Sequence, residues 1–162
     1  MASRIVTLQV NGREEELIAR PGTTLLGALR DGIGLTAAKR GCAQGTCGSC
    51  TVLVDDKAVP SCLVPVETVD GATIATLEGV APTGDLDELQ TAFLEDFATQ
   101  CGFCTSGMIM TAQALLAENP APTRADVVEA LSGNVCRCTG YEPIVNAVLD
   151  AADRRARAGR TA

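Results

Sequence analysis

Eight cysteines are the residues of this 162-residue chain whose types and spacing could do chemistry, and they form two groups of four. The N-terminal group consists of Cys42, Cys47, Cys50 and Cys62, and the C-terminal group consists of Cys101, Cys104, Cys136 and Cys138. The chain has no histidine, which excludes histidine-containing zinc sites and Rieske-type centres. Any metal bound by these groups is therefore held by thiolates alone.

The N-terminal group has a specific spacing. Its first two cysteines enclose four residues and its second and third enclose two, which is the opening spacing of plant-type [2Fe–2S] ferredoxins. Gly41, Gly45 and Gly48 lie in the same stretch and permit the positive φ angles of a loop that bends around a cluster. Such a loop also directs backbone N–H groups at the sulfur atoms. The pattern predicts a [2Fe–2S] site.

The C-terminal group consists of two short motifs that are far apart in the sequence. Cys101 and Cys104 enclose Gly-Phe, and Cys136 and Cys138 enclose a single Arg. We expect each motif at a turn between helices, and the two turns must meet for four ligands to close. Helices that begin after these turns would direct the positive ends of their dipoles at an anionic cluster. A second cluster is predicted here.

Two other interpretations of the cysteines are open. A disulfide scaffold agrees with the even count, but the N-terminus lacks the charged region and long apolar run of a signal peptide. A reducing, cytoplasmic setting is therefore expected. Zinc is an alternative mainly for the second group, since two separated cysteine pairs are also typical of zinc sites. The first group is less like zinc because its spacings are unequal.

The sequence pattern around the first group predicts short strands and one helix, which together form a small α+β module. Residues 4–18 predict a hairpin whose turn is Asn11-Gly12. Thr23 or Thr24 can cap a short apolar helix. Further short strands are expected at residues 51–54, 63–66 and 73–75, with a turn at Asp55-Asp56.

After about residue 80 the pattern becomes helical. Asp85 is expected to cap a first helix. The apolar stripe of that helix is Leu86, Leu89, Phe93, Leu94 and Phe97. A second helix is expected over residues 105–118, ending at Asn119-Pro120. Together with two further helices this predicts a compact bundle.

The last two expected helices carry clear start signals. Thr123 and Asp126 form a capping-box pattern for a helix that ends near Gly133. Pro143 suits the first turn of the final helix, which runs towards Arg154. The basic tail over residues 154–160 is expected to fray or to lie on a partner. We therefore predict two domains, residues 1–78 and 79–162.

Composition excludes several classes of function. Hydrophobic residues make up 46% of the chain, so a packed core is expected, and no stretch is long and apolar enough for a membrane span. The formal charge of −7 disfavours binding to nucleic acid. No histidine base, paired nucleophile or phosphate loop is present, so the sequence indicates an electron relay rather than a catalytic site.

Three segments carry a family resemblance: residues 41–53 (GCAQGTCGSCTVL), 100–104 (QCGFC) and 134–141 (NVCRCTGY). Together they resemble the iron–sulfur subunit of the xanthine oxidase family of molybdenum hydroxylases, and the likeness extends over about residues 4–150. It implies a plant-ferredoxin-like β-grasp domain followed by a four-helix bundle. It also implies two [2Fe–2S] clusters held by the eight cysteines.

The resemblance implies partners as well. A large subunit would carry the molybdenum–pterin cofactor and a medium subunit would carry FAD, in a heterotrimer or its dimer. Electrons would pass from molybdenum to the helical-domain cluster, then to the ferredoxin-like cluster and then to flavin. By position, Gln100 and Cys138 resemble the residues that touch the pterin. The alternative for Gln100 is an ordinary helix C-cap.

Departures from the family pattern occur at Ala43, Ser49 and Ser106, and none of them removes a cysteine. Ser106 stands where proline is usual, and we expect Ser106→Pro to change stability or redox potential only modestly. Two other functions stay open: a stand-alone two-cluster ferredoxin and a zinc-stabilised interaction module. The sequence leaves open the substrate of the whole enzyme and the final electron acceptor.

Overall fold

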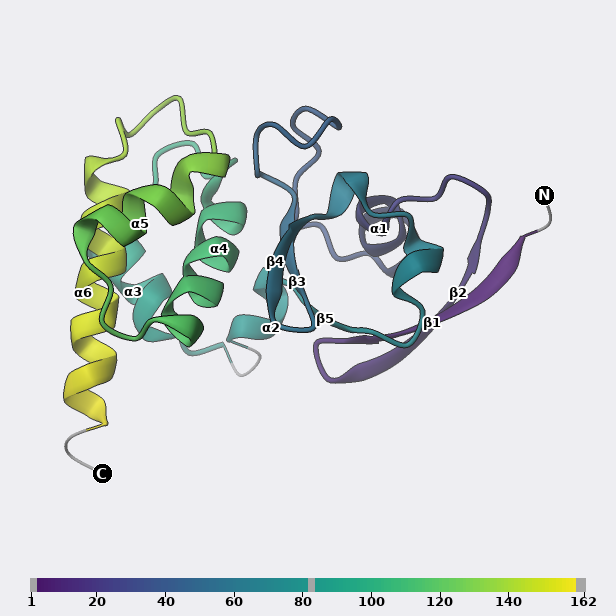
Figure 1. Cartoon of the computed structure of the whole chain (residues 1–162), viewed down its shortest axis with the longest axis horizontal. Helices are drawn as coiled ribbons and strands as arrows, with labels where there is room; N and C mark the ends of the chain where they lie inside the picture. Colours follow the sequence, from purple (N-terminus) through teal and green to yellow (C-terminus); the bar gives the residue numbers. More distant parts are fainter. Residues whose placement is uncertain (1–2, 82–83, 160–162) are drawn as a thin grey trace.

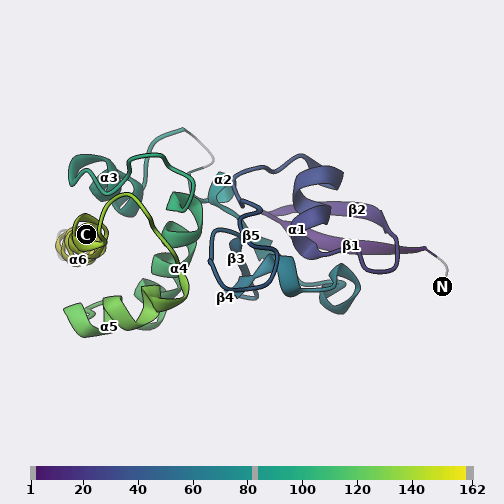
Figure 2. The same cartoon turned by 90° about the horizontal axis from the view of Figure 1, so that it is seen from above.

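The computed structural model describes residues 3–81 and 84–159. Two halves lie side by side along the long axis of the molecule (Figure 1). The N-terminal half is built on a sheet and the C-terminal half is built only of helices, as the view from above also shows (Figure 2). The chain is therefore an α+β protein, as predicted.

A five-stranded mixed sheet with the order β2-β1-β5-β3-β4 organises the N-terminal half. Its strands are β1 (Arg4–Val10), β2 (Arg13–Ala19), β3 (Thr51–Val54), β4 (Lys57–Pro60) and β5 (Thr73–Ala75). β1 pairs parallel with β5, and the other pairings are antiparallel. Asn11 and Gly12 both have positive φ, 51° and 78°, which matches a type I′ turn and confirms the predicted hairpin.

One face of this sheet is covered by α1 (Leu25–Gly27) and the π-helix η1 (Ala28–Ile33). Thr24 is the cap, since its hydroxyl accepts a hydrogen bond from Gly27 N at 3.1 Å. The Thr23 hydroxyl instead accepts from Arg20 N. The buried core beneath these helices is aliphatic and includes Val6, Leu8, Leu25, Leu26, Leu29, Val52, Val66 and Ile74.

The strand expected at residues 63–66 is wrong. Residues 63–66 instead connect two 3-10 helices, η2 (Ser61–Leu63) and η3 (Val66–Val69). The segment makes a single β-bridge, between Thr24 and Pro65. The physical reason is that Pro65 has no N–H to donate to a strand ladder. The strand that does follow the Asp55-Asp56 turn is β4, which the sequence analysis missed.

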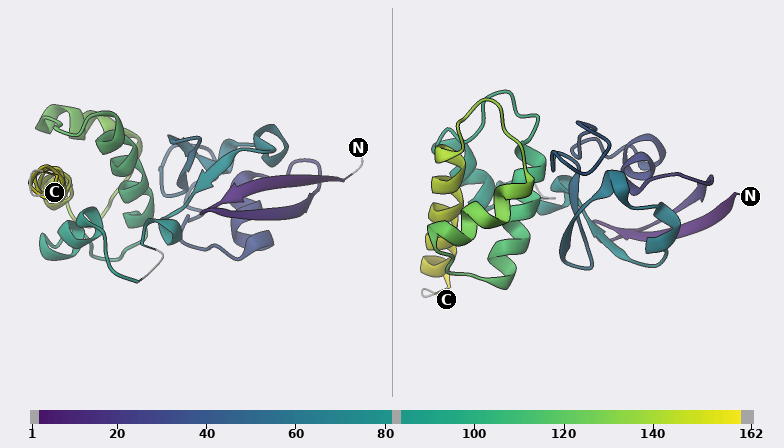
Figure 3. Two further views of the ribbon diagram at one scale, coloured as in Figure 1. Left: turned by 90° about the horizontal axis from the view of Figure 1, so that it is seen from below. Right: turned by 45° about the horizontal axis from the view of Figure 1, so that its top comes forward.

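Helices α3 (Glu88–Glu95), α4 (Thr105–Glu118), α5 (Arg124–Ala130) and α6 (Glu142–Ala158) form the C-terminal half, seen from two further sides in Figure 3. The short helix α2 (Leu77–Val80) precedes them and the 3-10 turn η4 (Leu131–Gly133) extends α5. Their common core includes Leu89, Phe93, Met108, Ile109, Val127, Leu131, Ile144, Val145 and Val148. The predicted span of α4 and the capping box of Thr123 and Asp126 are confirmed.

Two expectations about the helical half are wrong. Asp87, and not Asp85, caps α3, because its carboxylate accepts from Gln90 N in a reciprocal capping box. Of the expected stripe, Leu86, Leu94 and Phe97 are exposed. The helix ends at Glu95, so Phe97 lies beyond it with φ of 55°. The buried face of α3 therefore consists of Leu89, Ala92 and Phe93, and Leu94 lies on the exposed face of the same helix.

The basic tail is helical up to the end of α6 at Ala158, contrary to the expected fraying, and its alternative contact with a partner stays a prediction. Arg154 forms ion pairs with Glu95 and Asp150, and Arg155 pairs with Asp87. The pairs with Glu95 and Asp87 hold α6 against α3 and its N-cap, whereas the pair with Asp150 lies within α6. The last expected tail residue, Arg160, lies outside the described residues.

The two halves meet where α4 packs on β3 and β4. Gly107, in the first turn of α4, lies so close to the N-terminal half that a Cβ on it would be 2.1 Å from the Gly48 carbonyl oxygen. In the described part of the chain, none of the helices combines the length and apolar character needed to cross a bilayer. The close contact at Gly107 fixes the position of the cysteine loops, described next.

Candidate metal centres

The loop before β3 holds the first three cysteines of the N-terminal group. The Cys42 sulfur accepts hydrogen bonds from Gln44 N at 3.4 Å and Thr46 N at 3.3 Å. The Thr46 side chain and the Gln44 N–H lower the pKa of Cys42 to about 6. Backbone donors aimed at a sulfur atom stabilise a thiolate and raise the reduction potential of a cluster bound to it. The loop therefore stabilises the thiolate form of Cys42, as the predicted binding of a [2Fe–2S] cluster needs.

Glycines shape this loop at positions where an added Cβ would come close to a neighbouring side chain. A Cβ on Gly41 would lie 2.8 Å from Cys47 Sγ, and one on Gly45 would lie 2.4 Å from a methyl carbon of Leu63. Gly45 also has φ of 79°, and the neighbouring Ala43 has φ of 54°. The missing side chain of Gly41 therefore leaves room for the Cys47 sulfur, and Gly45 permits the positive φ of the loop.

Cys50, at the end of the loop, and Cys62, in η2, are buried. Burial raises the pKa of Cys50 to about 11, and its thiol interacts with that of Cys62. The Ser61 hydroxyl donates to the Cys50 carbonyl at 2.6 Å, which holds η2 against the start of β3. Metal binding deprotonates such thiols, because coordination replaces the proton.

The C-terminal group assembles from the loop before α4 and the loop before α6. The Cys138 and Cys101 sulfur atoms are 3.5 Å apart, and the thiols of Cys104 and Cys136 also interact. Burial raises the pKa of Cys104 to about 12. Desolvation acts in the same direction on Cys136, but hydrogen bonds from the Thr139 hydroxyl and N–H outweigh it and lower the pKa of Cys136.

All eight cysteines are free thiols, so the structure gives no support to a disulfide scaffold. In residues 3–81 and 84–159, no three histidine, cysteine, aspartate or glutamate side chains converge closely enough to hold one metal ion. Thiols within each group interact: Cys42 with Cys47, Cys50 with Cys62, Cys101 with Cys138, and Cys104 with Cys136, and in the second group Cys101 also interacts with Cys104 and Cys136. Paired thiols suit a [2Fe–2S] cluster, in which each iron takes two of the four thiolates.

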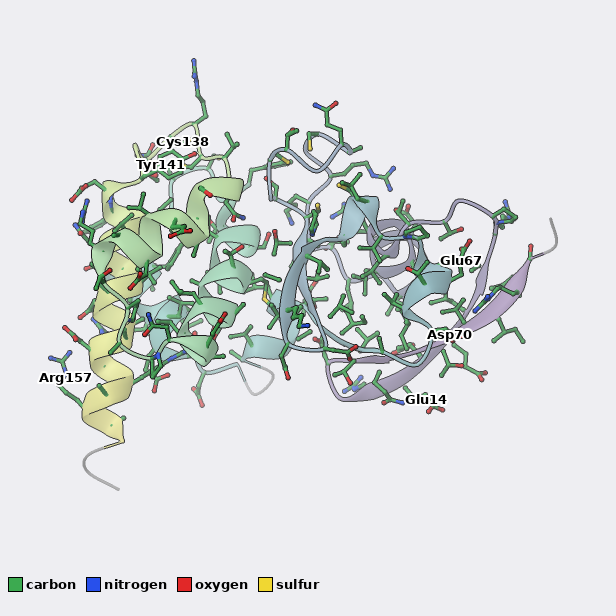
Figure 4. All side chains as sticks on the ribbon, in the orientation of Figure 1. Glu14, Glu67, Asp70, Cys138, Tyr141 and Arg157 are labelled. Atoms are coloured by element: carbon green, nitrogen blue, oxygen red, sulfur yellow. The ribbon has the colours of Figure 1, made fainter. Side chains whose placement is uncertain are left out.

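The two residues expected to touch the pterin, Gln100 and Cys138, are both exposed. Cys138 lies at one end of the helical half, close to Tyr141 (Figure 4). Gln100 is not a helix C-cap, since Asp96 occupies that position of α3. The alternative interpretation of Gln100 is therefore wrong, and its contact with a pterin stays a prediction.

Asn134 and Tyr141 have roles that the sequence did not predict, although both lie in the segment 134–141 that carries the family resemblance. The Tyr141 hydroxyl accepts from Cys136 N at 2.9 Å and donates to the Asn134 carbonyl at 3.1 Å. Val135 N donates to the Cys47 carbonyl at 2.9 Å, which joins the two cysteine loops. The available signal was that Tyr141 is the only tyrosine of the chain.

Family models match both halves of the chain. Residues 8–76 match the 2Fe-2S iron-sulfur cluster binding domain. Residues 76–149 match the [2Fe-2S] binding domain. The chain therefore contains two consecutive segments of [2Fe–2S]-binding type.

Whole-length relatives give the same result. The chain is 47% identical to the nicotinate dehydrogenase small FeS subunit of Eubacterium barkeri, over 92% of this chain and 95% of the relative. It is 47% identical to the xanthine dehydrogenase iron-sulfur-binding subunit of Escherichia coli O157:H7, over 91% and 95% of the two chains. The solved structure of quinoline 2-oxidoreductase from Pseudomonas putida 86 matches with a TM-score of 0.93 and 45% identity, over 98% of this chain and 99% of that one. The chain belongs to the family of small [2Fe–2S] iron–sulfur subunits of molybdenum hydroxylases.

Proposed function

We propose that this chain is the electron-transfer subunit of a multi-subunit molybdenum hydroxylase. Its two [2Fe–2S] clusters would be held by Cys42, Cys47, Cys50 and Cys62 in one half, and by Cys101, Cys104, Cys136 and Cys138 in the other. When bound, the clusters supply one-electron carriers between a molybdenum–pterin site in a large partner subunit and FAD in a medium one. The two domains are residues 1–78 and 79–162.

The observation that carries this proposal is the direct contact between the two cysteine loops. The Val135 N–H, next to Cys136, donates to the carbonyl of Cys47 at 2.9 Å. Each of these cysteines belongs to a different group of four thiols. A hydrogen bond and a few covalent bonds therefore connect the two groups, which gives electrons a short path between them.

The backbone of each loop sets the electrostatic environment of its sulfur atoms. The N–H groups of Gln44 and Thr46 offset negative charge at Cys42. The Thr139 N–H and hydroxyl do the same at Cys136, at 3.5 Å and 3.2 Å. Because these donors are already directed at sulfur, little reorganisation accompanies the arrival of an electron.

The entry face for electrons is proposed at the exposed end of the helical half. Cys101, Cys138 and Gln100 are exposed there, and Phe97 and Phe103 in the same α3–α4 segment are exposed as well. Exposed aromatic side chains beside redox ligands are typical of a protein–protein interface. We assign this face to the molybdenum-bearing subunit, with Gln100 and Cys138 nearest the pterin.

The names of the relatives support the assembly. They are small or iron–sulfur-binding subunits of nicotinate and xanthine dehydrogenases, so each belongs to a larger enzyme. A heterotrimer, or its dimer, is the assembly proposed for this chain. Cysteines that are not paired with one another in disulfides are typical of a reducing compartment, so we place that assembly in the cytoplasm.

Co-purification from the native host tests the proposal. We expect subunits that contain molybdenum and FAD to elute with this chain, and about four irons and four labile sulfides per chain. Cys42→Ser should remove one of two electron paramagnetic resonance (EPR) signals of the reduced protein, and Cys138→Ser should perturb only the other. A monomer with iron but without partners would support a stand-alone ferredoxin, and a colourless zinc protein would contradict both.

A further inference from the structure

Asn134 is a buried polar residue with contacts to three separate segments. It is 4% exposed, and its side-chain amide donates to the Gly48 carbonyl at 3.2 Å. Its side-chain oxygen accepts from the Thr111 hydroxyl of α4 at 3.0 Å. Its own carbonyl accepts from Tyr141, which also holds the N–H of Cys136. A buried amide with its partners fixed on different segments gives them one relative position.

The partner of this amide, Gly48, lies between the second and third cysteines of the N-terminal group. A Cβ on Gly48 would be 2.5 Å from both Asn134 Nδ2 and the Gly133 carbonyl oxygen. On another side, a Cβ on Gly107 would be 2.1 Å from the Gly48 carbonyl oxygen. The contact is therefore tight on two sides, and small displacements of Asn134 must displace the loop of the first group.

Directly after Asn134 the chain makes the hydrogen bond that joins the two loops. Val135 N donates to the Cys47 carbonyl, and the next residue is Cys136. The side chain of Asn134 thus binds the Gly48 carbonyl while the following peptide binds the carbonyl of Cys47, the residue before it. This double attachment fixes how far Cys136 lies from Cys47.

We infer that Asn134 is a positioning residue that sets the spacing between the two clusters and so the rate of electron exchange between them. The inference rests on the proposed function, because it needs a cluster in each half. Asn134 touches neither group of thiols through its side chain in any contact the structure gives. Its effect is exerted through Gly48 and through the Val135–Cys47 hydrogen bond.

Asn134→Asp is the most direct variant. It keeps the size of the side chain but replaces the N–H donor that faces the Gly48 carbonyl with a carboxylate oxygen. That carbonyl already accepts two bonds from Thr51, at 3.0 Å and 2.7 Å, and cannot donate. We expect the exchange of the Val135 amide with deuterium to rise at least about fivefold in the purified holo-assembly.

The second readout is the magnetic interaction between the two reduced clusters, which falls with the cube of their distance. We expect its splitting in EPR spectra to decrease in Asn134→Asp at unchanged iron content. Thr111→Val, which removes only the hydroxyl that orients Asn134, should give a smaller change in the same direction. Asn119→Asp is the matched control, since Asn119 donates to Asp126 far from the cysteines, and it should leave the splitting unchanged.

The outcomes separate the two proposals. A wild-type assembly without two cluster signals overturns the proposed function. The role of Asn134 alone is overturned if the wild-type assembly shows two normal signals but Asn134→Asp changes neither the splitting nor the exchange of the Val135 amide. A lower melting temperature without those changes shows a merely structural residue and also overturns it. If Asn134→Asp loses iron, Thr111→Val replaces it in the test: an unchanged splitting and unchanged Val135 exchange in that variant overturn the role of Asn134.

Discussion

The two halves of the molecule build their cysteine sites in different ways. In the N-terminal half, three of four cysteines lie in one glycine-rich loop, and backbone N–H groups of that same loop reach Cys42. In the helical half, the pairs come from loops before α4 and α6, and a tyrosine hydroxyl holds Cys136 N. A local loop specifies the first site, whereas packing of distant helices specifies the second. The second site should therefore depend more on single side chains.

Gly107→Ala, at the interface between the two halves, is expected to have the largest effect. In Gly107→Ala, the new Cβ meets the Gly48 carbonyl at 2.1 Å, and a backbone atom cannot move aside as a side chain can. We expect a loss of about 3 kcal/mol or more in the free energy of unfolding, from overpacking. Thermal denaturation measures it, and Gly32→Ala, where a Cβ meets nothing within 4 Å, is the control. Equal melting temperatures for the two variants would show that the halves are not in tight contact.

Tyr141→Phe tests the dependence of the second site on one hydroxyl. The change leaves the Cys136 N–H without its acceptor and the Asn134 carbonyl without its donor. Half-buried groups left unpaired cost about 1–3 kcal/mol. We expect weaker retention of iron in the helical half only, measured as selective loss of one EPR signal during chelation. Loss of both signals together would argue against separate sites.

Gly45→Ala is the corresponding change in the first site. Gly45 has φ of 79°, and a Cβ there meets the flexible end of Leu63, so the main cost is the positive φ. A destabilisation of about 1–2 kcal/mol is expected, confined to the first cluster. The reverse change, Ala43→Gly at φ of 54°, should stabilise the same loop. Denaturation of both variants checks this, and a stabilised Gly45→Ala would contradict it.

Ser106→Pro is expected to have the smallest effect. The Ser106 hydroxyl is buried and, among the described residues, is the only such side-chain atom without a hydrogen-bond partner. Proline is tolerated in the first turn of a helix and removes this unpaired group. We expect a gain of about 0.4–1 kcal/mol with both clusters retained. Loss of the second cluster in a potentiometric titration would show that the hydroxyl has a role of its own.

Local signals in the sequence predicted most of the fold. The Asn11-Gly12 turn, the capping box of Thr123 and the span of α4 each depend on residues close in the chain. The stripe expected beyond Asp85 failed because exposed Leu94 and Phe97 are as apolar as core residues. Periodicity reports apolar side chains and does not reveal which of them the fold covers.

The candidate sites show the same limit. The cysteine groups were evident from spacing, because a ligand set is encoded by residue type. The attachment between them was not, since Asn134 and Gly48 are 86 positions apart and neither belongs to the ligand set. Only the folded chain shows that the Cys47 carbonyl meets Val135 N.

The most direct test of the account is the number of unpaired electrons in the fully reduced assembly. Integration of its EPR spectrum should give about two spins per copy of this chain beyond any from molybdenum or flavin, divided between two distinct signals. One spin, or none with eight thiols that react freely, would contradict the central claim that each half of the chain holds its own [2Fe–2S] cluster.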